Sequence, residues 1–177
     1  MPIAIELKSI KLNQRASEET YAYSAKLFVD GVHVCDVAND GHGGCDRMVG
    51  PGKGIAYGDA HRLYDEACRR VIAELPKQNL ADEGEPENLV DDSMDYLCAR
   101  LVTRDILTKK AARDVKRTVM FFKEGLPAEG ARAPIYSFRL DGDPQRLYAH
   151  IRTKHPKAWI LNEHPMEDIV KAYERSE

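Results

Sequence analysis

The feature that most constrains this 177-residue chain is a glycine-rich run from Asn39 to Gly54, which holds six of the chain's twelve glycines. Glycine adopts positive φ easily and lets other groups approach the backbone closely. The run follows a strand-like segment and precedes a helix-like one. We therefore expect a loop over residues 41–58 that divides a β-region from an α-region, and loops of this kind receive phosphates, metals or partners.

Residues 1–40 are predicted to form a three-stranded antiparallel meander. Alternating apolar residues mark strands at Ile3–Leu12, Tyr21–Val29 and Val32–Val37. The apolar face changes near Lys8–Ser9, which predicts a β-bulge there. Asp30–Gly31 is typical of a two-residue hairpin turn with positive φ at both positions.

The remainder of the chain predicts helices packed on one face of a mainly antiparallel sheet, an α+β fold. The length favours a single domain. Its expected parts are the β-meander at 1–40, the glycine-rich loop at 41–58, three helices within 59–125 (59–75, one from Asn88, and 108–124), and a β-hairpin (135–140 with 146–153) and C-terminal helix within 134–177.

Composition limits the classes of function. The net charge of −3 gives no overall attraction to nucleic acid or anionic membranes. No apolar run approaches the roughly 18 residues that span a bilayer, and the first residues do not resemble a signal peptide. We therefore expect a cytoplasmic protein with no membrane partner, whose four cysteines are reduced thiols.

The end of the glycine-rich run suggests a phosphate-binding alternative. Gly52, Lys53 and Gly54 lie close to the start of a predicted helix, where free N–H groups favour an anion. A P-loop requires Ser or Thr after the lysine and glycine at the position of Arg47, so the pattern is incomplete. A flexible connection is the structural alternative.

A metal site is a further alternative. Cys35, His42 and Cys45, with His33, offer the thiolate and imidazole ligands that zinc prefers. Their spacing does not match that of a zinc finger or ribbon, so we expect no metal and no cofactor.

Catalysis has weak support in the sequence. Cys45 is a candidate nucleophile with His42 or His61 as its base. Asp40 and Asp46 with His42 are candidates for acid–base chemistry. Neither set has a diagnostic spacing, so we assign no catalytic residue and favour a protein that is not an enzyme.

Recognition of a partner is the functional interpretation that the sequence favours for the glycine-rich loop. The loop carries small or polar side chains that an apolar sheet would present to solvent. The candidate partner-binding residues are Asn39, Asp40, His42, Asp46 and Arg47.

An acidic segment from Gln78 to Ala99 contains no lysine or arginine. Such a cluster is able to compete for a basic, nucleic-acid-binding surface, as an inhibitor of a nuclease or CRISPR complex would. The structural alternative is a solvated linker followed by a helix whose acids complement its dipole. The candidate residues are Glu83, Glu85, Glu87, Asp91 and Asp92.

A basic segment follows between Arg100 and Lys123. Lys109, Arg113, Lys116 and Arg117 fall on one stripe if residues 108–124 are helical. That stripe would suit a phosphate backbone, so nucleic-acid binding is a further alternative. The structural alternative, which the net charge of −3 favours, is a solvated face or pairing with the acidic segment.

The motifs Ser17–Glu–Glu–Thr20, Phe28–Val–Asp–Gly31 and Asn39–Asp–Gly–His–Gly–Gly44 resemble those of small proteins carried by bacteriophages and plasmids. Trp159–Asn162 and Asp168–Glu177 fit the ends of those proteins more loosely. That family has no assigned activity, so the resemblance transfers no catalytic residue. It implies a mobile-element context, in which small proteins often bind and inhibit host defence machinery. We therefore expect an accessory protein that binds a protein partner, such as a host nuclease or CRISPR complex.

Overall fold

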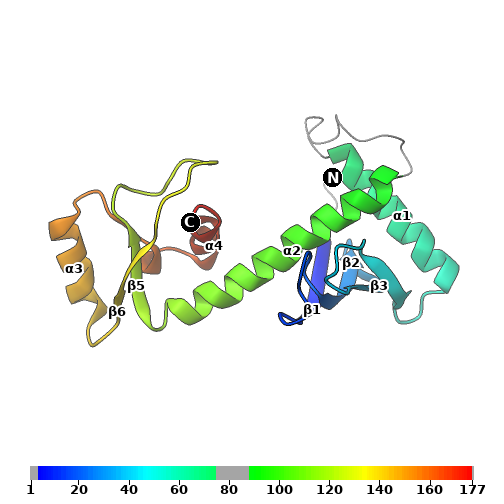
Figure 1. Cartoon of the computed structure of the whole chain (residues 1–177), viewed down its shortest axis with the longest axis horizontal. Helices are drawn as coiled ribbons and strands as arrows, with labels where there is room; N and C mark the ends of the chain where they lie inside the picture. Colours follow the sequence, from blue (N-terminus) through cyan, green and yellow to red (C-terminus); the bar gives the residue numbers. More distant parts are fainter. Residues whose placement is uncertain (1–3, 75–87, 177) are drawn as a thin grey trace. The chain divides into compact units, whose positions relative to one another are not determined.

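The computed structural model describes residues 4–74 and 88–176, which form an α+β fold with two antiparallel sheets. The length predicts one domain, whereas the chain divides into two compact units, Met1–Thr103 and Arg104–Glu177. We call them the N-terminal unit and the C-terminal unit. Each has its own sheet and core, which is why the division falls within a helix and not within a sheet (Figure 1).

The sheet of the N-terminal unit has four strands in the order β1-β2-β3-β4. Three of them, β1 (Ile5–Leu12), β2 (Tyr23–Val29) and β3 (Val32–Asn39), confirm the predicted meander. The fourth, β4 (Arg47–Pro51), lies inside the predicted loop over residues 41–58. It pairs with β3 from Cys35 to Ala38, and this tertiary pairing overrides the weak strand propensity of a glycine- and proline-containing segment.

The predicted turn and bulge are both confirmed. Asp30 and Gly31 have φ values of +49° and +82°, as a type I′ turn requires. Ser9 has φ +55°, and the register of β1 against β2 shifts between Lys8 and Lys11. Because of the bulge, Leu12 pairs with the buried Tyr23 and lies on the same face of the sheet.

One face of this sheet forms the core of the N-terminal unit. Directly opposed pairs on β2 and β3, Ala25 with Val37 and Leu27 with Cys35, are buried. Helix α1 (Tyr57–Glu74) packs against β3 and β4 and buries Ala60, Tyr64, Ala67 and Cys68. Its start confirms the helix predicted after the glycine-rich run.

Helix α2 (Asn88–Asp114) begins where the second helix is predicted and continues much further. In the N-terminal unit its apolar stripe is Met94, Cys98 and Val102, all fully buried. The prediction of a separate helix over 108–124 is wrong. Thr108 lies inside α2, where its hydroxyl donates a hydrogen bond of 2.7 Å to the carbonyl of Arg104 one turn earlier.

Part of the predicted third helix forms the central strand of the C-terminal unit. Its sheet has the order β6-β5-β7, with β5 (Thr118–Phe122), β6 (Tyr136–Arg139) and β7 (Trp159–Ile160). Val119 and Phe121 enter one buried cluster, and Met120 and Phe122 enter another. Because both faces are covered, the strand is a continuous apolar run, which periodicity cannot distinguish from a helix.

The prediction of a strand over 146–153 is also wrong, because helix α3 (Pro144–Lys154) occupies this segment. Asp143 caps the helix by accepting a hydrogen bond of 3.0 Å from the amide of Gln145, and Pro144 suits the first turn. A short 3-10 helix, η2 (Leu161–Glu163), leads to α4 (Met166–Glu174), which confirms the helix predicted after Pro165.

Within residues 4–74 and 88–176, no helix has both the length and the apolar character needed to cross a bilayer.

Candidate functional site

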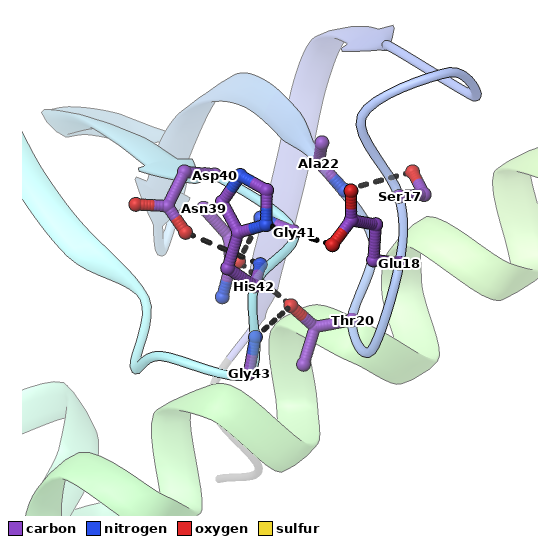
Figure 2. Close-up of polar contacts among 9 residues, drawn as sticks. All are labelled: Ser17, Glu18, Thr20, Ala22, Asn39, Asp40, Gly41, His42 and Gly43. Carbon is purple, nitrogen blue, oxygen red and sulfur yellow. Dashed lines mark hydrogen bonds and ion pairs between the residues drawn. The ribbon is translucent and has the colours of Figure 1, made fainter.

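Two segments of the N-terminal unit, residues 13–22 and 39–47, lie against each other and form what we call the loop platform (Figure 2). The carbonyl oxygen of Gly41 accepts hydrogen bonds from the amides of Glu18, Glu19 and Thr20, at 3.1, 2.9 and 3.3 Å. The SEET and NDGHGG motifs, about twenty residues apart in the sequence, are therefore neighbours in the fold.

Asn39 is the buried residue that joins the two loops. Its Oδ1 accepts hydrogen bonds from the Thr20 hydroxyl and from the Gly41 amide, both at 2.9 Å. Its Nδ2 donates to the carbonyl of Gly44 at 2.8 Å. Asn39 was predicted to contact a partner, but its side chain is only 9 % exposed and its polar atoms are satisfied within the protein. Its role is to hold the platform together.

Gly41 is required by its surroundings. Its φ is +92°, and a Cβ at this position would lie 2.1 Å from the carbonyl oxygen of Ala16 and 2.9 Å from the Ala22 Cβ. No other residue fits this conformation and space without displacement of the backbone. The close approach of the two loops therefore depends on glycine at this point.

Of the other four predicted partner-binding residues of the loop, Asp40, His42 and Arg47 are exposed and Asp46 is half-buried. The ring of His42 lies 3.3 Å from Glu18 Oε2, and a guanidinium nitrogen of Arg47 lies 3.5 Å from Asp40 Oδ2. Exposed ion pairs of this kind contribute little to stability. Because His42 faces Glu18, the structure gives no support to His42 as a base for Cys45.

A pocket of about 370 Å³ opens beside the platform, within the N-terminal unit. The strand end at Tyr23, the loop from Gly43 to Asp46 and one face of α2 form its walls. The amide of Asp46 donates a hydrogen bond of 2.6 Å to Asp95 Oδ1 and so joins the loop to α2. The lining residues are Thr20, Tyr21, Tyr23, Asn39, Gly43, Gly44, Cys45, Asp46, Asp95, Tyr96 and Ala99.

Burial perturbs the titratable groups around this pocket. It raises the pKa of the Asp46 carboxyl, and the charge of Asp95 adds to the increase, whereas polar contacts with Tyr23 and Asn39 oppose it. Burial likewise raises the pKa values of the Tyr23 hydroxyl and the Cys98 thiol, and the negative charge of Asp46 adds to both. Clusters of perturbed groups in a concave site are typical of functional sites.

The acidic segment contributes to the site through a residue that the sequence interpretation did not select. Asp95 lines the pocket, and its spacing from Cys98 on α2 would have indicated a position next to the buried helix stripe. Asp91 and Asp92 belong to α2, but their side chains lie outside the described part of the chain. Glu83, Glu85 and Glu87 lie outside it altogether.

The structure places the candidate phosphate residues in a turn after β4. The amide of Gly52 donates to the carbonyl of Val34 at 2.8 Å, and a Cβ on Gly52 would lie 1.8 Å from the carbonyl oxygen of His33. The Gly52 amide is therefore already hydrogen-bonded within the protein and is not available to a phosphate. Lys53 and Gly54 are exposed, and Gly54 has φ +82°.

The four candidate basic residues do not form one helical stripe. Lys109 and Arg113 belong to α2, whereas Lys116 and Arg117 follow its end at Asp114. Lys109 pairs with Asp105 at 2.6 Å, and Arg113 pairs with Asp114 at 3.3 Å. These local pairs favour a solvated face for this segment.

Across residues 4–74 and 88–176, no three His, Cys, Asp or Glu side chains are arranged to hold a metal ion. The comparisons with protein-family models, curated proteins and solved structures found no match.

Proposed function

We propose that this protein acts by binding a protein partner through the loop platform. The observation that carries the proposal is that Asn39 holds two separate loops in one arrangement, while Asp40, His42 and Arg47 remain exposed on it. The buried polar groups serve the fold, and the exposed ones are available to a partner.

A platform of this kind suits recognition because its backbone is organised before binding. Hydrogen bonds between the loops restrict their conformations in the unbound protein, so less conformational entropy is lost on association. The exposed ion pairs of His42 with Glu18 and of Arg47 with Asp40 are weak enough to exchange for contacts with a partner.

Charge favours a basic partner surface. Residues 1–103 contain 18 Asp and Glu against 11 Lys and Arg. Complementary charge steers association and disfavours partners of like sign. Nucleic-acid-binding enzymes have basic surfaces that would complement this negative charge. The resemblance to mobile-element proteins makes a host nuclease, restriction or CRISPR complex the first partner to test.

The test is co-elution of the full-length protein with purified candidate complexes in size-exclusion chromatography at micromolar concentration. A triple variant, Asp40→Ala with His42→Ala and Arg47→Ala, removes the exposed platform side chains. The matched control, Asp65→Ala with His61→Ala and Arg69→Ala, removes the same residue types from exposed positions on α1.

We expect the platform variant to lose the complex and the α1 variant to retain it. Equal binding by both variants, or a turnover activity with no complex formed, would contradict the proposal. Circular dichroism of both variants confirms that each is folded.

A further inference from the structure

Strand β6 lies at an edge of the sheet in the C-terminal unit, and its outer side is free. The amide of Leu140 donates a hydrogen bond of 2.8 Å to the carbonyl of Arg117, which fixes the phase of the antiparallel ladder between β5 and β6. Because hydrogen-bonded pairs alternate along such a ladder, the backbone N–H and C=O groups of Ser137 and Arg139 point away from β5. These groups have no hydrogen-bond partner among the described residues. The outer side of β6 is therefore able to pair with another extended chain.

The edge at β6 lacks the protection that the outer strand of the N-terminal sheet has. Strand β1 carries the charged residues Glu6 and Lys8 and a bulge at Ser9, which are typical features that prevent pairing with another chain. All four residues of β6 are exposed. Two of them, Tyr136 and Phe138, lie on the same face of the strand and are 38 % and 41 % exposed. An added strand would cover apolar surface that the chain itself leaves in water.

The two exposed rings are held in position by their neighbours. The Phe138 ring is stacked on the buried Phe121 ring, with 5.8 Å between the ring centres and 14° between the planes. The Tyr136 ring lies 5.8 Å from the same Phe121 ring, and Nζ of Lys123 lies 3.7 Å from its centre. An apolar side chain of an added strand would therefore pack against a surface that is already organised.

A pocket of about 420 Å³ borders the opposite face of β6, within the C-terminal unit. Ser137 alternates with the two aromatic residues along the strand and lines this pocket. Lys110 and Arg117 line it as well, and both are exposed. Neither forms an ion pair with a described residue. The pocket therefore offers two cations beside the free edge.

The charge of this pocket favours an acidic side chain. Asp114 also lines the pocket, but its carboxylate accepts a hydrogen bond of 2.9 Å from the Tyr173 hydroxyl and pairs with Arg113 at 3.3 Å. Residues 104–177 contain 15 Lys and Arg against 11 Asp and Glu. Complementary charge steers association and disfavours a partner of like sign, so an acidic segment is favoured at this edge.

We infer that the free side of β6 binds an extended, acidic segment of a protein partner as an added strand. Backbone hydrogen bonds to Ser137 and Arg139 hold the segment. Its apolar side chains pack on Tyr136 and Phe138, and an acidic side chain on the other face enters the pocket. This surface uses no residue of the loop platform, and neither proposal depends on the other.

The test uses full-length ¹⁵N-labelled protein and a seven-residue peptide of alternating valine and glutamate with blocked ends. A second peptide has lysine in place of glutamate, and a third is the glutamate peptide with methylated backbone amides, which cannot donate hydrogen bonds. We expect saturable amide shifts at Ser137 and Arg139 with the glutamate peptide, binding of the lysine peptide that is weaker by about tenfold or more, and no saturable shift with the methylated peptide. Equal binding of the glutamate peptide and either comparison peptide, or no saturable shift up to the solubility limit, would overturn the inference.

The double variant Lys110→Ala with Arg117→Ala tests the pocket. We expect it to bind the glutamate peptide about tenfold more weakly than the wild type. The matched control, Lys53→Ala with Arg69→Ala, removes the same charges from exposed positions in the N-terminal unit and should leave the affinity unchanged. Equal affinities of the two variants would assign the effect to net charge and contradict the site. The amide spectrum of each variant shows whether it is folded.

Two further measurements identify other occupants of the edge. Ser137→Pro removes an outward N–H group that the ladder with β5 does not use. A dimer of the free wild type in analytical ultracentrifugation that this variant abolishes would assign the edge to a second copy of the chain. Binding of fluorescein-labelled oligothymidylate more tightly than the glutamate peptide would assign the aromatic and basic surface to single-stranded nucleic acid. Either result would overturn the assignment to an acidic protein segment.

Discussion

The hydroxyl of Thr20 donates a hydrogen bond of 2.9 Å to Oδ1 of Asn39, and this contact joins two loops that are distant in the sequence. The same oxygen accepts the amide of Gly41, and the Thr20 hydroxyl also accepts the amide of Gly43 at 3.4 Å. A single pair of small polar side chains therefore organises the platform. Two neighbouring features contribute: Gly41 allows the two loops to approach each other closely, and the Asp46 amide joins the platform to Asp95 of α2.

Asn39→Ala removes three hydrogen bonds from a buried position and leaves their partners unsatisfied. At roughly 1 kcal/mol for each bond, we expect the free energy of unfolding to fall by about 2–4 kcal/mol. Urea denaturation gives this value. Asp40→Ala, at the adjacent exposed position, should change it by less than about 0.5 kcal/mol. Similar losses in both variants would show that Asn39 does not hold the loops.

Gly41→Ala and Gly54→Ala form a matched pair, because both glycines have positive φ, +92° and +82°. Each substitution adds the strain of a left-handed alanine, about 1–2 kcal/mol. Gly54 has open space around it, whereas at Gly41 the new methyl group meets the Ala16 carbonyl. We expect Gly41→Ala to have a clearly lower thermal midpoint than Gly54→Ala. Equal midpoints would argue against the close packing of the two loops.

Asp46 makes stability depend on pH. Burial raises its pKa above the ordinary value of 3.8, so the folded state binds more protons than the unfolded state between the two values. The free energy of unfolding therefore falls as the pH rises through that interval. The groups that face Asp46 are Tyr23 from β2, Tyr64 from α1, and Asp95 and Cys98 from α2.

Asp46→Asn replaces the carboxyl group with an uncharged amide, so the free energy of unfolding no longer falls over this pH interval because of residue 46. We expect the variant to be more stable than the wild type near neutral pH, and the difference to disappear below the ordinary pKa of 3.8. Denaturation curves recorded across the pH range check the sign. Asp65→Asn is the control, and a pH-independent difference for Asp46→Asn would show that the charge is not responsible.

The four cysteines should differ sharply in reactivity. Cys45 is exposed, whereas Cys35, Cys68 and Cys98 have no exposed surface. Burial raises the pKa of Cys35 to about 12 and that of Cys98 well above its usual range, which suppresses the reactive thiolate. We expect iodoacetamide to modify Cys45 in the folded protein and all four cysteines in urea, as measured by peptide mass spectrometry. Modification of Cys98 at the rate of Cys45 would contradict the burial of the α2 stripe.

Local signals predicted the parts of the fold that local chemistry controls. The Asp30–Gly31 turn and the bulge at Ser9 follow from φ preferences and from the change of apolar face. The start of α1 and the helix after Pro165 follow from apolar spacing and helix-start residues. Each of these features depends on residues within one or two turns of each other.

The wrong predictions concern segments whose secondary structure depends on packing against residues distant in the sequence. Thr118–Phe122 is compatible with helix or strand, and it is a strand because helices and loops of the C-terminal unit cover both of its faces. Arg47–Pro51 becomes a strand because β3 has a free edge to pair with. The segment from Asp143 to Lys154 contains a capping residue and a proline that indicate a helix, and the predicted hairpin strand over 146–153 does not take them into account.

By itself, the sequence determined an α+β protein with a polar, glycine-rich loop, because glycine spacing and apolar alternation act on the backbone locally. Only the tertiary structure decided which residues of that loop are structural and which are exposed. It buried Asn39, left Asp40 and His42 on the surface, and placed Asp46 beside Asp95, forty-nine residues away. Such long-range contacts depend on which buried polar groups find partners when the helices pack on the sheet, and no local pattern contains that information.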